Sequence, residues 1–90
     1  MEKTWHAFLS LCLKAKNPNA LEKLLDCFLT IEEKNDIIDR YLILKYLLEK
    51  QLTQRDIAQQ LKVSISKITR GSNALKTIDD QLKIFLKREI

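Results

Sequence analysis

Apolar residues recur every three or four positions along almost the whole chain, a spacing that predicts amphipathic helices rather than strands. The first helix is predicted from about Glu2 to Lys16, and the second over roughly 18–28. Asn17 and Pro18 end the first helix and begin the second. Proline is well tolerated at the first position of a helix, because the backbone N–H that it lacks would have no partner there. The apolar stripes of the two helices are Trp5, Phe8, Leu9 and Cys12, then Leu21, Leu24, Leu25 and Phe28.

A longer helix is predicted from the capping pair Thr30 and Glu33 to about Lys50. The Thr30 hydroxyl can accept a hydrogen bond from the Glu33 backbone N–H, and the Glu33 carboxylate can accept one from the Thr30 N–H. Apolar residues lie on more than one side of this helix: Ile37, Ile38, Tyr41, Leu42, Leu44, Tyr46, Leu47 and Leu48. A helix that is apolar on two sides is packed on two sides, and in so small a chain this points to a partner subunit.

Residues 53–76 are predicted to form a short helix, a three-residue turn and a second helix, which is the helix-turn-helix arrangement. Thr53 and Asp56 form a second capping pair, and Ser64 can cap a helix over about 65–76. The packed side of this pair is expected to consist of Ile57, Ala58, Leu61, Val63, Ile65, Ile68, Ser72 and Leu75. The opposite side of the second helix is expected to consist of Lys67, Arg70 and Ala74. A last helix is predicted over roughly 80–88.

Composition and charge point to two kinds of partner. Hydrophobic residues make up 46% of a 90-residue chain, so part of this surface is expected to be covered by a second chain. Six basic residues and one acid between Lys50 and Lys76 give that segment a charge of +5, whereas the other ten basic and eleven acidic residues sum to −1. A surface that binds nucleic-acid phosphates requires such confined positive charge. On spacing alone, a two-helix hairpin with a solvated basic face stays open as an alternative.

The other chemistry-bearing residues indicate neither a catalytic nor a metal site. The single histidine, His6, has no neighbouring acid or cysteine partner, so the chain is not predicted to be an enzyme. Cys12 and Cys27 fit no metal or redox spacing and are interpreted as reduced, buried residues. Because the chain shows neither a signal-peptide pattern nor an apolar run of membrane-spanning length, a cytoplasmic protein is expected.

The only glycine lies inside the second helix of the pair, where it costs about 1 kcal/mol relative to alanine. Gly71 marks close helix packing, a helix that frays at this position, or a place where a ligand or phosphate needs the room of a missing Cβ. The run around it, Ile68-Thr69-Arg70-Gly71-Ser72-Asn73-Ala74-Leu75-Lys76, closely resembles the signature of the tryptophan repressor family. The resemblance extends without gaps from about Trp5 to Phe85, through Leu29-Thr30 and Leu52-Thr53-Gln54-Arg55.

The resemblance implies an all-α fold of six helices and an intertwined homodimer. A single domain over residues 1–90 is expected, with dimerisation helices at 1–50, the helix-turn-helix at 53–76 and a C-terminal helix at 80–88. The resemblance also implies L-tryptophan as co-repressor, double-stranded operator DNA as partner, and no metal. We therefore expect a transcriptional repressor that binds operator DNA when loaded with tryptophan. A helix-turn-helix regulator that does not respond to tryptophan is the alternative.

For the ligand, the resemblance implies that the indole lies between Arg40 and Arg70, with Gly71 beside the ring. A guanidinium plane stacked on an indole is a favourable cation–π arrangement. Arg70 would also pair with the ligand carboxylate. Thr30 matches a second polar contact, although its role as a helix cap is sufficient by itself.

The ligand ammonium is expected at the backbone carbonyls of Cys27 and Leu29. Here the chain departs from the family, because Ala74 stands where a serine hydroxyl usually helps to hold the ammonium. Ala58 and Lys67 also differ from the usual lysine and threonine, so one positive charge has moved from the first helix of the pair to the second. The first departure affects ligand selectivity, and the other two affect the choice of operator.

For DNA, the resemblance carries over residues from both helices of the pair. They are Gln54, Arg55, Ile65, Ser66, Lys67, Thr69, Ser72, Asn73 and Lys76. Arg55 could offer a bidentate contact to guanine, and most of the others would position the protein through phosphates or water.

Overall fold

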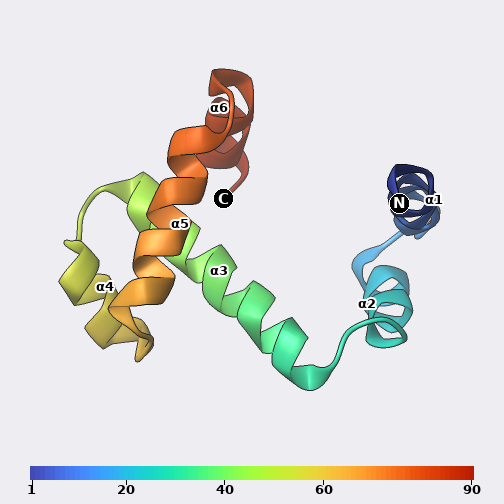
Figure 1. The fold of residues 1–90 in the computed structure, drawn as a ribbon, viewed down its shortest axis with the longest axis horizontal. Coiled ribbons are helices and arrows are strands. Elements are labelled where there is room, and N and C mark those ends of the chain that lie inside the picture. Colours follow the sequence, from blue (N-terminus) through green and yellow to red (C-terminus); the bar gives the residue numbers. More distant parts are fainter. The chain divides into compact units, whose positions relative to one another are not determined.

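The structure, a computed structural model, describes all 90 residues and contains six α-helices and no strand. The helices are α1 (Glu2–Leu13), α2 (Pro18–Asp26), α3 (Ile31–Glu49), α4 (Gln54–Leu61), α5 (Ile65–Thr77) and α6 (Asp80–Glu89) (Figure 1). The predicted all-α fold of six helices is therefore confirmed. The chain divides into two compact units, Met1–Lys34 and Asn35–Ile90, and each is described by itself. The expected organisation as one domain stays a prediction.

The helix starts follow from the capping residues that the sequence indicates. Thr30 accepts a hydrogen bond from the Glu33 backbone N–H at 3.1 Å and donates its own N–H to the Glu33 carboxylate at 2.8 Å. Thr53 and Asp56 make the same reciprocal pair at 3.1 and 3.3 Å. The Ser64 hydroxyl accepts from the third residue of α5 at 3.3 Å. Each cap satisfies backbone N–H groups that have no partner inside the helix.

The first two helices end earlier than predicted. α1 stops at Leu13 rather than near residue 16, and Asn17 has an extended backbone with φ −155°. A residue that precedes proline is driven out of the helical region in this way. α2 stops at Asp26, and the next two residues continue with N–H groups bonded three residues back, a tightened turn that is common at helix ends.

The unit Met1–Lys34 has no fully buried side chain. The rings of Trp5 and Phe8 stack with centroids 5.5 Å apart, and Phe8 meets Phe28 edge-on at 5.0 Å. Trp5 and Phe28 are nevertheless 59% and 54% exposed. Cys27 is exposed too, and Cys12 is only half-buried. The interpretation of both as buried residues is therefore wrong, because this unit has no interior to hold them.

The unit Asn35–Ile90 has a small core where α3, α4 and α5 meet. Its fully buried side chains are Ile43, Ile57 and Ile68, and Ala58 completes the cluster. Partly buried residues surround it: Tyr46, Leu47, Leu52, Leu61 and Val63. The predicted packed side is thus confirmed at most positions. Ile65 is an exception at 50% exposure, because it begins α5 before that helix reaches the core.

Candidate functional site

α4 and α5 pack against each other and form the predicted helix-turn-helix. The turn depends on Lys62, which has a left-handed backbone with φ 57°. The N–H of the next residue, Val63, donates to the Ala58 carbonyl at 3.1 Å and closes the end of α4. The chain then enters α5 through the Ser64 cap, with the N-terminal turn of α5 at the surface.

Most of the predicted DNA-contacting residues are exposed on this pair of helices. The exposed ones are Gln54, Arg55, Ile65, Ser66, Thr69, Asn73 and Lys76, and the half-buried ones are Lys67 and Ser72. Arg55 and Lys76 take part in no ion pair, so their charges are available to an anionic partner. Their roles toward DNA stay predictions.

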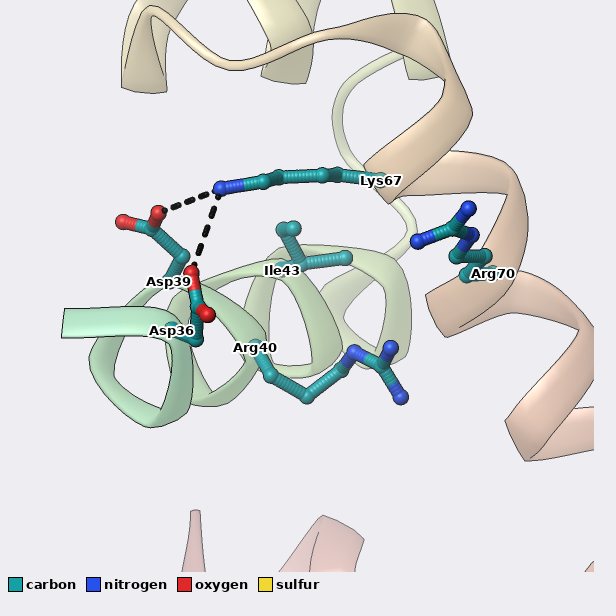
Figure 2. Close-up of a pocket in the computed structure, with 6 residues that line it drawn as sticks. All are labelled: Asp36, Asp39, Arg40, Ile43, Lys67 and Arg70. Atoms are coloured by element: carbon teal, nitrogen blue, oxygen red, sulfur yellow. Dashed lines mark hydrogen bonds and ion pairs between the residues drawn. The ribbon is translucent and has the colours of Figure 1, made fainter. Parts of the chain in front are cut away.

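Lys67 is the one basic residue of the +5 segment that already has partners. Its Nζ lies 3.2 Å from Asp39 Oδ2 and 3.6 Å from Asp36 Oδ1, both on α3 (Figure 2). The hydrogen bond to Asp39 raises the pKa of the Lys67 ammonium above its ordinary value of 10.5, and the two nearby negative charges add to this effect against the opposing effect of desolvation. This side chain therefore reaches toward α3, while 43% of it stays exposed to solvent.

Arg40 and Arg70 line one small pocket between α3 and α5, with a volume of about 180 Å³. Figure 2 shows their side chains reaching toward the same opening from the two helices, with Ile43 to one side. Neither arginine takes part in an ion pair. Asp36, Asp39 and Lys67 line the same pocket, and the two carboxylates are paired with Lys67. The five charged side chains sum to +1, and the two unpaired guanidinium groups beside an aliphatic side chain suit a flat molecule that carries a carboxylate.

Gly71 lies where α5 crosses α3. A Cβ added there would stand 2.7 Å from Ile43 Cγ2, and Ile43 is 1% exposed. The interpretation of Gly71 as a site of close helix packing is therefore confirmed, and its contact with a ligand stays a prediction. One turn further on, Ala74 is half-buried and its carbonyl accepts from the Thr77 hydroxyl at 2.9 Å.

The other predicted ligand contacts belong to the unit Met1–Lys34. Thr30 is the cap of α3, with its hydroxyl bonded to Glu33. The backbone carbonyls of Cys27 and Leu29 accept no hydrogen bond from the chain, so both can receive a donor. These carbonyls follow α2 in the segment before α3, which is why no helix uses them.

Some charged residues near α5 were not identified from the sequence. Asp36 and Asp39 lie outside the basic segment, so a local charge sum omits them. Lys83 and Lys87 of α6 line a groove with Lys50 and Lys76, and no ion pair involves any of the four. Only a signal of tertiary contact would have grouped them.

The structure contains neither a metal-binding cluster nor a membrane-spanning helix. No group of three or more His, Cys, Asp or Glu residues has an arrangement that could hold a metal ion. None of the six helices combines the length and apolar character that crossing a membrane requires.

Comparison with known proteins gives a consistent result. The Trp repressor protein family matches residues 3–90. The Trp operon repressor homolog of Chlamydia trachomatis serovar D is 51% identical over 89 residues, covering 99% of this chain and 95% of the relative. The homolog from Chlamydia caviae is 52% identical over 86 residues (96% and 85%), and one from Xylella fastidiosa is 36% identical over 89 residues (99% and 95%). These are transcription regulators rather than enzymes, and this chain belongs to the Trp repressor family.

Proposed function

We propose that the protein is a homodimeric repressor that binds double-stranded operator DNA when it is loaded with L-tryptophan. The observation that carries this proposal is the pocket that Arg40 and Arg70 line, both unpaired, together with Ile43 and between α3 and the second helix of the helix-turn-helix. A ligand in that pocket would touch both α3 and α5, so it could favour one placement of α5 over another.

DNA binding is supported by the surface of α4 and α5. Helix-turn-helix proteins, among which the Trp repressor is a standard example, place the second helix of the pair in the major groove. Here that helix exposes Ser66, Thr69 and Asn73, which can bond to phosphates, base edges or bridging water. Arg55 on α4 is exposed and unpaired, so it can make a bidentate contact to guanine.

The proposal of a tryptophan site is supported by residues that complement the indole, the carboxylate and the ammonium of the ligand. The indole can stack on the guanidinium planes of Arg40 and Arg70, and the carboxylate can pair with Arg70. The resemblance to the family assigns the ammonium to the backbone carbonyls of Cys27 and Leu29, which accept no hydrogen bond within the unit Met1–Lys34. At about 180 Å³ the arginine pocket is smaller than most ligand sites, so we expect other groups to complete it.

Ala74 sets the expected strength of ligand binding. Without a hydroxyl at this position the ammonium loses one donor–acceptor contact, worth roughly 1.5–3 kcal/mol for a charged group and less where water replaces it. Ala74→Ser is therefore expected to bind L-tryptophan more tightly, with a smaller gain for the deaminated analogue indole-3-propionate. Calorimetry with both ligands measures this, and an unchanged ratio of the two affinities would remove the hydroxyl argument.

The homodimer is supported by the apolar surface that a single chain leaves open. Ile37, Ile38 and Tyr41 on α3 are between 48% and 55% exposed. A groove of about 470 Å³ lies on this side of α3, lined largely by apolar atoms of Ile37, Tyr41, Leu44, Leu86 and Ile90. Exposed apolar surface of this extent marks an interface, and a second copy with the same surface gives a closed, symmetric one.

The decisive experiment is a DNA titration at fixed salt, with and without L-tryptophan, against fragments of the organism's own tryptophan-gene promoters. Tighter binding with tryptophan supports the proposal, and equal binding supports the alternative regulator that does not respond to it. Arg70→Ala tests the pocket, since it should abolish the response to tryptophan. Arg88→Ala is the matched control, because Arg88 is an exposed arginine of α6 outside the pocket.

A further inference from the structure

The pairing of Lys67 bears directly on how strongly the reading helix can attract DNA. Lys67 is the third residue of α5, in the exposed turn that would approach the phosphates. Its ammonium is held by Asp39 at 3.2 Å and Asp36 at 3.6 Å. The other five basic residues of the +5 segment have no such partner: Lys50, Arg55, Lys62, Arg70 and Lys76.

The pairing lowers the local positive charge that the sequence suggests. One lysine against two carboxylates gives these three residues a net charge of −1, although Arg40 and Arg70 in the same pocket bring its lining to +1. A phosphate that approaches this turn meets the carboxylates as well as the ammonium. Carboxylate and phosphate oxygens accept the same N–H donors, so Lys67 can serve the DNA fully only by giving up its contacts on α3.

We propose that Asp36 and Asp39 compete with DNA phosphates for Lys67, and that this acid pair limits the affinity of the reading helix for DNA. The proposal rests on the DNA-binding function proposed above and adds two residues that determine affinity without touching DNA. The side chains of the three residues are 33% to 70% exposed. Exposed ion pairs are weak, so relieving this competition should raise DNA affinity only about two- to five-fold.

Two simpler explanations would give a similar gain. Removing any acid near DNA lowers the general repulsion, and the ion pairs could instead serve only to fasten α5 to α3. The first explanation predicts that another acid of α3 behaves like Asp36 and Asp39. The second predicts a loss of stability without a change in DNA affinity. Glu49 is the matched control, because it is exposed on the same helix and has no partner at Lys67.

The test is fluorescence anisotropy with a labelled mixed-sequence duplex at fixed salt. The variant Asp36→Asn/Asp39→Asn should bind two- to five-fold more tightly than the original chain, and Glu49→Gln should not match this gain. In a Lys67→Met background the same two substitutions should have no effect, because no ammonium remains to be released.

Three results would overturn the proposal. They are an equal gain in the Lys67→Met background, an equal gain from Glu49→Gln, and no gain from the double variant. If no variant binds DNA at all, with or without tryptophan, the proposed function itself fails and this inference fails with it. An NMR titration of the Lys67 ammonium, whose pKa should fall in the double variant, reports separately on the pairing.

Discussion

The two units of the chain differ in how they bury apolar side chains. Asn35–Ile90 encloses Ile43, Ile57 and Ile68 at 1% exposure or less. Met1–Lys34 is also mostly helical, yet it buries no side chain. Helix formation and core formation are thus separate in this molecule. Capping residues and the spacing of apolar residues suffice for helix formation, but core formation needs three helices that pack together.

This difference in burial indicates which unit depends on a partner for its stability. Isolated helices of 9 and 12 residues, the lengths of α2 and α1, are marginal in water. Their stability must come from apolar contacts, and within one chain the principal ones join Trp5, Phe8 and Phe28. A second copy of the chain, as proposed, would supply the missing cover. Asn35–Ile90 already has a core of its own and presents the candidate site on its surface.

The largest expected effect is the loss of stability on removing an aromatic side chain from the unit Met1–Lys34. If a second copy covers the aromatic cluster, Phe8→Ala should cost about 3–5 kcal/mol, as for a buried phenylalanine. If the cluster stays half exposed, the cost should be nearer 1 kcal/mol. Equilibrium unfolding at several protein concentrations measures this cost, and its midpoint should rise with concentration for the original chain. His6→Ala, on the same helix and exposed, is the control. A midpoint independent of concentration would contradict the dimer.

A second prediction sharpens the description of the enclosed core. Gly71→Ala gains about 1 kcal/mol of helix propensity, but its methyl group meets Ile43 at 2.7 Å. Overpacking of this kind costs typically 1–3 kcal/mol, so we expect a net loss of stability of about 1 kcal/mol. In an Ile43→Ala background the same substitution should be neutral or stabilising, because the methyl then enters a cavity. Equal effects in both backgrounds, measured by denaturant unfolding, would show that the helices do not touch there.

A third prediction concerns backbone strain in the same unit. Lys62 holds φ 57°, a left-handed conformation that costs a residue with a Cβ roughly 1–2 kcal/mol. Lys62→Gly removes this cost but adds freedom to the unfolded chain, for an expected net gain of about 0.5 kcal/mol. Lys62→Ala is the control, since alanine keeps the Cβ and should bring no gain. A shift in thermal midpoint for Gly but not for Ala is the expected result.

The smallest expected effect is the pH dependence of the Lys67 ion pairs. Asp39 raises the pKa of Lys67 above 10.5 in the folded chain. The contribution of the pairs is therefore complete below that pH, and it disappears as the pH rises through the folded value. The stability difference between the original chain and Asp36→Asn/Asp39→Asn should be constant from neutral pH to about pH 9–10 and should vanish above the folded pKa. A difference that grows in alkali would contradict the sign of the shift.

The sequence predicts the features that depend on neighbouring residues. Thr30 with Glu33 and Thr53 with Asp56 fix helix starts through contacts three residues apart, so their geometry could be read from the residues alone. The same holds for the helix-turn-helix. The signature around Gly71 then led to Arg40 and Arg70, which the structure places in one pocket.

Features that depend on distant residues could not be predicted in this way. The sequence does not indicate the ion pairs of Lys67, because its partner Asp39 lies 28 residues earlier in the chain. Its ion pairs exist only because α3 and α5 cross. Likewise, the apolar stripe of α1 predicts a buried face but does not indicate what covers it. Trp5, which belongs to this stripe, is exposed in a single chain.

The contact at Gly71 also has a mechanical consequence. Gly71 is the middle residue of α5, with six residues on each side, and Ile43 stands directly under it. The crossing therefore acts as a fulcrum with two arms of about 9 Å, at 1.5 Å of rise per residue. A tilt of about 10° about this point would move the ends of α5 by roughly 1.6 Å in opposite directions. If α5 pivots there, a ligand that pushed Lys67 on one arm away from α3 would move Lys76 on the other arm in the opposite direction.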